Sequence, residues 1–211
     1  MTPSTAEAAE PVAAAETARP RTAARRLRRA VGAAAITVGA LGVAFILVGL
    51  PLYVFPAVDA VPAQADVVYV IGPPTPARIA LARKLIETGA ADEMLISVPG
   101  DALAEGTPSR GRFSACNLPG GDVLCRAPDP ATTQGEARLL AETAQEQGWD
   151  SAIVITMTPH VSRARMIIDR CFDGELTMRA VSDQPSGLGG WVHQYLYQSG
   201  AFVKALAAPG C

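Results

Sequence analysis

Apolar residues follow two different patterns along the chain, and each pattern predicts a different kind of structure. The stretch from Val31 to Phe55 contains 25 residues and no charge. At about 1.5 Å per residue, a helix of this length exceeds the roughly 30 Å hydrocarbon core of a bilayer. The pattern therefore predicts one transmembrane helix near the beginning of the chain.

After residue 65, short β-branched apolar runs alternate with amphipathic stretches. We expect strands at 67–71, 94–98, 123–125, 152–156 and 176–181, and helices at 75–88, 132–148, after His160 and at 192–207. Alternation of this kind predicts βαβ units and a parallel sheet. The expected fold is therefore a doubly wound α/β domain of about five strands, in the order 3-2-1-4-5.

The predicted elements divide the chain into four parts. Residues 1–30 form a tail, of which 1–24 are rich in Ala, Pro, Thr and Glu without apolar periodicity and are expected to be disordered. Residues 31–55 form the membrane helix, 56–65 a short linker and 66–211 the folded α/β domain. The polar, Gly- and Pro-rich stretch 99–118 is expected to be an irregular insertion in that domain.

Charge is distributed unevenly, and this predicts an orientation in the membrane. Residues 1–30 hold six arginines and three acids, whereas the remaining chain has a net charge of −5. The positive-inside rule places the basic tail in the cytoplasm and the acidic domain outside the membrane. The alternative is a signal peptide cleaved after Ala65, although signal-peptide apolar regions are usually only about 7–15 residues long.

The charge pattern also excludes one class of partner. An acidic domain without a basic face does not fit nucleic-acid binding. Within the predicted membrane helix, small residues at Gly32, Ala35, Gly39, Gly42 and Gly49 would allow close helix packing and self-association. Scatter of small residues in an Ala- and Gly-rich chain is the simpler interpretation.

All four cysteines follow the membrane helix, which fits an oxidising location. Four cysteines allow three disulfide pairings. Cys116 and Cys125 are close in sequence and form the preferred pair, which leaves Cys171 to bond Cys211. A zinc site is the alternative, but the sequence contains no Cys-x-x-Cys, and we predict no metal.

The loop after the fourth expected strand carries the most informative polar residues. Ligands of doubly wound sheets bind at the carboxyl ends of strands beside the switch point, here between the first and fourth strands. Thr156, Thr158, His160 and Arg163 lie at this point of the chain. A helix N-terminus, hydroxyl donors and an arginine suit an anion, and a histidine suits proton transfer. Capping and packing roles are the alternative.

Two other strand-to-helix loops bring further candidates to the same edge of the sheet. Gly72 and Arg78 follow the first strand, in a loop that lacks both the dinucleotide and the P-loop fingerprints. Ser97 ends the second strand. Thr132 or Thr133 is expected to cap the helix that follows, and Thr133 and Glu136 form a Thr-x-x-Glu pattern, for which a capping box is the structural interpretation.

The ordered set of these motifs resembles the YdcF-like family, which includes the SanA and ElyC envelope proteins. That family has Asp, an apolar strand, Gly and Arg-x-x-x-Ala-x-x-Leu-x-x-x-Gly, then a strand-end Ser, Thr-x-x-Glu, and Thr followed by His-x-x-Arg-Ala. The matching residues here are Asp66, Gly72, Arg78, Ala82, Leu85, Gly89, Ser97, Thr133, Glu136, Thr156, His160, Arg163 and Ala164. The resemblance covers about residues 66–181.

The resemblance implies a Rossmann-like fold and a role in maintaining the cell envelope, linked to peptidoglycan and lipid-carrier metabolism. One branch of the family is associated with S-adenosylmethionine binding. Two departures affect the second strand: Ser97-Val98-Pro99-Gly100 replaces the usual Ser-Gly-Gly, and the insertion with Cys116 and Cys125 replaces a glutamate and helix.

Together these patterns predict a single-pass membrane protein whose extracytoplasmic domain binds a phosphorylated or other anionic small molecule. If it is an enzyme, we expect hydrolysis or transfer at a phosphate ester or pyrophosphate of a cell-wall or lipid-carrier precursor. The expected catalytic residues are His160 and Glu136. The expected ligand-binding residues are Gly72, Arg78, Ser97, Thr133, Thr156, Thr158 and Arg163. A non-catalytic envelope sensor or scaffold and a nucleotide or S-adenosylmethionine binder are the alternatives, and the sequence does not identify a cofactor.

Overall fold

The computed structural model describes residues 21–103, 116, 122–183 and 187–211. The chain divides into two compact units, Met1–Phe45 and Ile46–Cys211, and we describe each by itself. Most of the predicted disordered tail and most of the predicted insertion lie outside the described residues.

The predicted membrane helix is present as helix α1 (Arg21–Gly49), which the π-helical turn η1 (Leu50–Val54) continues. Helix α1 begins before the predicted start at Val31, because the arginines, alanines and leucine of that stretch are good helix formers. Ala24–Val54 is the one helix in the described part of the chain that is long and apolar enough to cross a membrane. A retained anchor and a signal sequence share these properties.

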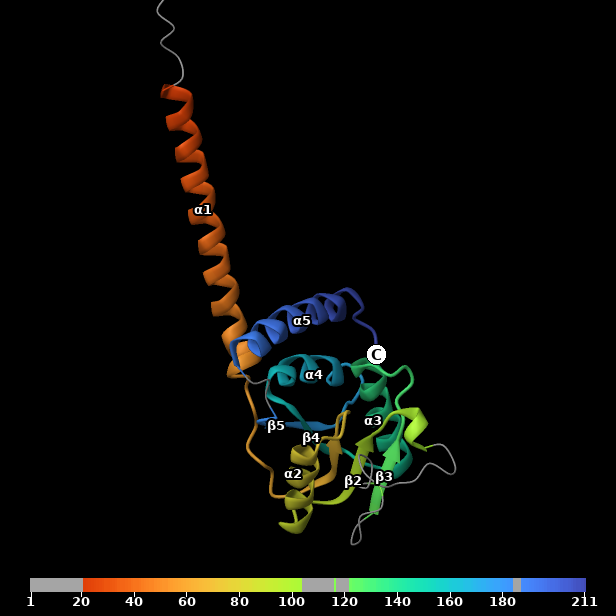
Figure 1. Cartoon of the computed structure of the whole chain (residues 1–211). Coiled ribbons are helices and arrows are strands. Elements are labelled where there is room, and N and C mark those ends of the chain that lie inside the picture. Colours follow the sequence, from red (N-terminus) through yellow and green to blue (C-terminus); the bar gives the residue numbers. More distant parts are fainter. Residues whose placement is uncertain (1–20, 104–115, 117–121, 184–186) are drawn as a thin grey trace, which may run out of the picture. The chain divides into compact units, whose positions relative to one another are not determined.

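The α/β fold and its strand order are confirmed in the second unit (Figure 1). Five parallel strands form one sheet in the order β3-β2-β1-β4-β5. The strands are β1 (Ala65–Val70), β2 (Ala91–Ser97), β3 (Asp122–Arg126), β4 (Ser151–Met157) and β5 (Glu175–Val181). Each lies within a few residues of its predicted position.

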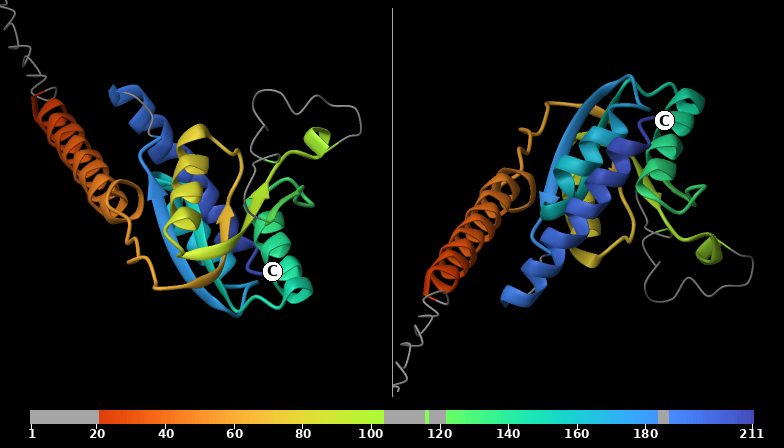
Figure 2. Two further views of the ribbon diagram at one scale, coloured as in Figure 1. Left: turned by 90° about the horizontal axis from the view of Figure 1, so that it is seen from below. Right: turned by 90° about the horizontal axis from the view of Figure 1, so that it is seen from above.

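Helices cover both faces of this sheet, which explains why the central strands are continuously apolar. Helix α2 (Pro76–Glu87) packs on one face, whereas α3 (Thr133–Gln147) and α4 (Val161–Ile168) pack on the other. Successive residues of β1 point alternately into these two cores. Helix α5 (Gly187–Ala207) lies across the outside of α4 (Figure 2).

The segment between η1 and β1, predicted as a linker, is held against the sheet by Asp59. Its Oδ2 accepts hydrogen bonds from the Met178 backbone N–H and from Arg165, each at 2.7 Å. The Arg179 guanidinium donates to the Asp59 carbonyl oxygen. This clamp fixes the end of η1 relative to β5 and α4.

Both preferred disulfides are present. Cys116 bonds Cys125 with their Cα atoms 5.8 Å apart, and Cys171 bonds Cys211 with a Cα separation of 5.0 Å. The first ties the insertion to β3, and the second ties the segment after α5 to the end of α4. With all four thiols in disulfides, they are not available as zinc ligands.

Candidate functional site

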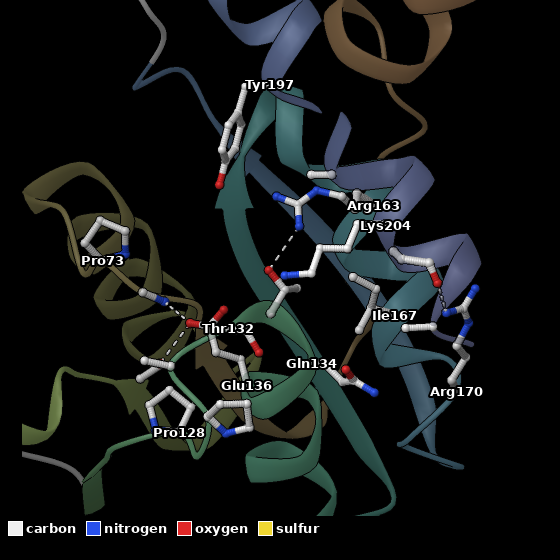
Figure 3. Close-up of a pocket in the computed structure, with 18 of the residues that line it drawn as sticks. Pro73, Pro128, Thr132, Gln134, Glu136, Arg163, Ile167, Arg170, Tyr197 and Lys204 are labelled. Carbon is white, nitrogen blue, oxygen red and sulfur yellow. Dashed lines mark hydrogen bonds between the residues drawn. The ribbon is translucent and has the colours of Figure 1, made fainter. Parts of the chain in front are cut away.

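A cavity of about 1020 Å³ lies at the carboxyl ends of β1 and β2. The first turn of α3 forms one side of it, and α4 and α5 form the other (Figure 3). Four prolines (Pro73, Pro99, Pro128 and Pro130) give it a largely apolar rim. A large, partly apolar cavity with a few converging polar groups is typical of a small-molecule site.

Glu136 lies buried at the base of this cavity. Its Oε1 accepts a hydrogen bond of 2.7 Å from the Gly72 backbone N–H and one of 2.9 Å from Ser97 Oγ. A Cβ at position 72 would lie 3.2 Å from the same oxygen, so the approach depends on glycine there. No described residue hydrogen-bonds the second carboxyl oxygen, Oε2, which leaves it available to a ligand.

The predicted capping box of Thr133 and Glu136 is not formed. Of the two threonines expected to cap the helix, Thr132 is the N-cap, and its side chain accepts from the Gly135 N–H at 3.2 Å. The Glu136 carboxyl instead accepts from the Gly72 N–H and from Ser97 Oγ at the sheet edge. Thr133 and Glu136 are therefore both available to the cavity.

Burial raises the pKa of Glu136 to about 7, against the opposing effects of its hydrogen bonds from Ser97 and Gly72 and of the positive charges of Arg78 and Arg163. A carboxyl with this pKa exists in both protonation states near neutral pH. Such a group can donate or accept a proton on a bound molecule.

The opposite wall carries positive charge. Arg163 from α4 and Lys204 from α5 extend into the cavity toward Glu136, and Tyr197 lies beside them (Figure 3). The Arg163 guanidinium is fixed from two sides: Nε donates to Gln198 Oε1 at 2.9 Å and NH1 donates to Thr133 Oγ1 at 3.2 Å. No described acid lies within ion-pair distance of Arg163 or Lys204, so both charges can attract an anion.

His160 does not line the cavity but lies directly behind Thr133. Its Nε2 is 3.3 Å from Thr133 Oγ1, and its Nδ1 is 2.8 Å from the buried Thr156 Oγ1. Burial lowers the pKa of His160 well below its usual range, and the charges of Arg163 and Arg78 lower it further. A neutral ring has one donor and one acceptor, so one threonine donates to it and the other accepts. His160 thus positions Thr133.

Arg78 is occupied with the chain's own backbone. Its NH1 donates to the carbonyl oxygens of Ile71, Gly72 and Pro73, and its Nε pairs with Asp183 Oδ2 at 3.1 Å. The structure therefore places Arg78 beneath the loop that carries Gly72, rather than in the cavity. Its positive charge still acts on Glu136 from there.

The helix N-terminus after Thr158 is covered by the chain itself. Thr158 donates to the Val181 carbonyl oxygen at 3.3 Å, and Ser162 donates to the Leu52 carbonyl oxygen at 3.0 Å. Turn η1 packs against this point. Of the predicted site residues, the structure thus gathers Gly72, Ser97, Thr133, Glu136 and Arg163 around the cavity, and places Arg78, Thr156, Thr158 and His160 outside its lining.

Sequence reasoning did not find the contribution of α5 and of the segment after it. Gln198 is fully buried and orients Arg163, although it lies in a mostly apolar helix. The polar pair Gln194 and Gln198, four residues apart, was the available signal. Gly210 also lines the cavity, where Gln134 donates to its carbonyl oxygen at 2.7 Å beside the disulfide of Cys211.

Among the described residues, no cluster of three or more histidine, cysteine or acidic side chains could hold a metal ion. The polar groups of the cavity are instead three cations (Arg163, Arg170 and Lys204), one carboxyl, the amide of Gln134, and the hydroxyls of serine, threonine and tyrosine. This set suits an anionic organic molecule with an apolar part.

A scan against protein-family models gave no match, and a search of curated proteins gave no match. The geometry of this cavity and the sequence motifs that meet there are therefore the indications of function.

Proposed function

We propose that the α/β domain binds a phosphorylated or similarly anionic small molecule in the cavity between α3 and α5. The observation that carries this proposal is the position of Glu136, whose carboxyl is buried opposite Arg163 and Lys204, neither of which has a described acid within ion-pair distance. Arg163 and Lys204 bind the anionic group, and the apolar rim receives the rest of the molecule.

The fixed geometry of Arg163 supports a binding role. Its two hydrogen bonds, to Gln198 and Thr133, hold the guanidinium plane in place before a ligand arrives. A pre-oriented guanidinium binds phosphate or carboxylate at lower entropic cost than a flexible side chain does. Lys204 adds a point charge from the neighbouring helix.

Glu136 supplies the proton chemistry in this proposal. Near neutral pH its carboxyl is partly protonated, and in that form it donates a hydrogen bond from Oε2 to an oxygen of the ligand. In a phosphate-ester or pyrophosphate hydrolase or transferase, the same proton would be given to the departing oxygen. His160 holds Thr133, and through it Arg163, in position.

The membrane topology is part of the proposal. Ala24–Val54 acts as a single-pass anchor with the arginine-rich end in the cytoplasm, so the α/β domain faces the outside of the cell membrane. The two disulfides support an extracytoplasmic location for the α/β domain, because disulfides persist in oxidising compartments.

We also propose that the chain is a YdcF-like envelope protein, with a role linked to cell-wall or lipid-carrier precursors. Support comes from five residues that belong to the motifs resembling that family and that line one cavity: Gly72, Ser97, Thr133, Glu136 and Arg163. These residues come from four separate parts of the sequence.

Thermal unfolding of the full-length, oxidised chain in detergent tests the proposal. The panel contains phosphate, pyrophosphate, nucleotides, S-adenosylmethionine, and sugar and isoprenyl phosphates. A ligand at about 100 times its dissociation constant adds roughly 2.7 kcal/mol of stability, which is a readable shift in Tm. The shift should be lost in Arg163→Gln and kept in Arg83→Gln, which removes an exposed arginine of α2.

A shift that Arg163→Gln keeps would place the ligand elsewhere and overturn the proposed site. No shift from any anion, with the chain well folded, would overturn anion binding itself.

Binding without turnover is the second candidate function. Both ring nitrogens of His160 are engaged by threonine hydroxyls, and the ring lies outside the cavity lining, which favours a sensor over an enzyme that uses His160 as its base. Product formation from a ligand identified in the panel, absent in Glu136→Gln, would decide for the enzyme.

A further inference from the structure

Helix α5 carries an apolar face that is exposed among the described residues. Its exposed side chains include Leu188, Val192, Leu196, Val203 and Leu206, of which Leu188 is 82% exposed and Val203 68%. Leu196 also lines the edge of the cavity. Their spacings of four, four, seven and three residues place them along one side of a helix. Large aliphatic side chains gathered on one face mark a contact surface for a partner or a membrane.

The same helix is joined to the end of the candidate membrane span. Tyr53, in η1, is buried against α5: its ring lies edge-on to Tyr195 with the centroids 5.2 Å apart, and 6.1 Å from the ring of Phe202. Its hydroxyl is 3.0 Å from Ser199 Oγ. These residues belong to one compact unit, so α5 is held where the chain leaves the span.

The composition of α5 suits the boundary between lipid and water. The helix contains Trp191, Tyr195 and Tyr197, and aromatic residues of these two kinds are enriched at membrane interfaces. It contains no acid, and its one lysine, Lys204, lies on the cavity side rather than among the exposed aliphatic residues. An apolar face beside a polar edge is the pattern of a helix that lies in the plane of the interface.

From these observations we propose that the outer face of α5 is a membrane-contact surface, embedded in the headgroup region of the bilayer that Ala24–Val54 spans. The partner is the lipid surface itself. The inference rests on the proposed membrane anchor and is independent of the ligand in the cavity. It also explains why a helix with this apolar face is kept exposed in the folded domain.

The two tryptophans of the chain provide a test. Trp191 lies in α5, whereas Trp149 is buried in the core between α3 and β4. The full-length chain is reconstituted into phosphatidylcholine and phosphatidylglycerol vesicles, with and without lipid brominated on its acyl chains. Trp149→Phe then reports on Trp191 alone, and Trp191→Phe reports on Trp149 alone.

We expect brominated lipid to quench Trp191 strongly and Trp149 very little, and iodide in the water to quench Trp191 weakly. Adding Val192→Asn and Val203→Asn to the Trp149→Phe chain should reduce lipid quenching and increase iodide quenching, because it makes the outer face polar. Neither position lines the cavity.

Three results would overturn the inference, and they differ from one another. If the chain does not float with the vesicles, the membrane anchor fails together with the inference. If the chain floats but Trp191 is quenched by iodide and not by brominated lipid, α5 is held in water and the anchor stands. If Trp191 is protected from both quenchers and light scattering in detergent shows a dimer, the face is covered by a second copy.

Discussion

Ser97 at the end of β2 donates a hydrogen bond of 2.9 Å to Oε1 of Glu136, which lies 39 residues later on α3. The same oxygen accepts from the backbone N–H of Gly72, so one carboxyl oxygen joins two strand ends and a helix. The contact leaves Oε2 without a partner among the described residues and fixes the carboxyl in a buried position. The proposed chemistry of the cavity follows from this arrangement.

The first prediction concerns stability against pH. The pKa of Glu136 is about 7 in the folded chain, above its ordinary value of 4.5. The folded state therefore binds the proton more tightly, so the stabilisation is complete below pH 4.5 and is lost as pH rises through 7. The loss amounts to about 3 kcal/mol in the free energy of unfolding. Denaturant titrations across this pH window measure it.

Glu136→Gln should remove most of this pH dependence, because the amide keeps the shape and does not titrate. Glu142→Gln, an exposed position on the same helix, serves as the control and should leave the pH dependence unchanged. If the free energy of unfolding changes equally with pH in wild type and in Glu136→Gln, another group is responsible for the pH dependence.

The second prediction concerns Gly72. Alanine at this position would bring its Cβ to 3.2 Å from Glu136 Oε1 and 3.3 Å from the Ser97 carbonyl oxygen. The crowding should separate Glu136 from its donors and cost about 1–3 kcal/mol of stability. Gly189→Ala, where a Cβ meets nothing within 4 Å, should cost nothing. Urea unfolding of the two variants checks this, and an unchanged midpoint for Gly72→Ala would contradict it.

The third prediction concerns Thr133, which touches both His160 and Arg163. Thr133→Val keeps the shape but removes the hydroxyl, so the buried Nε2 of His160 loses its partner. We expect a loss of about 1–3 kcal/mol in unfolding free energy and weaker anion binding. Thr133→Ser keeps the hydroxyl and should restore both. If Thr133→Val and Thr133→Ser have the same unfolding free energy and the same anion affinity, the hydroxyl does not hold the site together.

The fourth prediction compares the disulfides. Cys171 and Cys211 are 40 positions apart, whereas Cys116 and Cys125 are only 9 apart. When each pair is replaced by serine, loop-closure entropy predicts a loss of about 4 kcal/mol in unfolding free energy for the Cys171–Cys211 bond and of about 2.5 kcal/mol for the Cys116–Cys125 bond. Removing the Cys171–Cys211 bond should also weaken ligand binding, because it frees the segment that places Gly210 at the cavity. Equal binding in both double variants would exclude that link.

Much of the fold could be predicted because its signals are local. Runs such as Val67 to Ile71 are apolar at every position, which fits a strand with helices on both faces. Alternation with helical patterns then favours a parallel sheet, and the order β3-β2-β1-β4-β5 agrees. The preferred disulfides followed from the short spacing between Cys116 and Cys125.

The roles within the site could be predicted only in part, because they depend on contacts between distant elements. The sequence left Thr132 and Thr133 as alternative caps, and Thr132 makes the cap. Glu136 does not complete a capping box but accepts from Gly72, just after β1, and from Ser97 at the end of β2. The Arg163 contact to Gln198 spans 35 residues and depends on how α5 packs on α4. No local pattern carries that information.

The central claim is that Glu136 and Arg163 form one anion site, and a binding measurement against pH tests it most directly. The ligand is a phosphodiester analogue of a compound identified in the thermal panel, because a diester keeps a constant charge near neutral pH. As pH rises through about 7, Glu136 becomes negative and opposes the anion. Affinity should then fall about tenfold, which corresponds to roughly 1.4 kcal/mol.

Titration calorimetry on the full-length chain, with Glu136→Gln alongside, gives the answer. The account predicts that the wild-type affinity falls across pH 7 and that the variant's affinity stays level. An affinity that is independent of pH in wild type, or a fall that persists in Glu136→Gln, would contradict it.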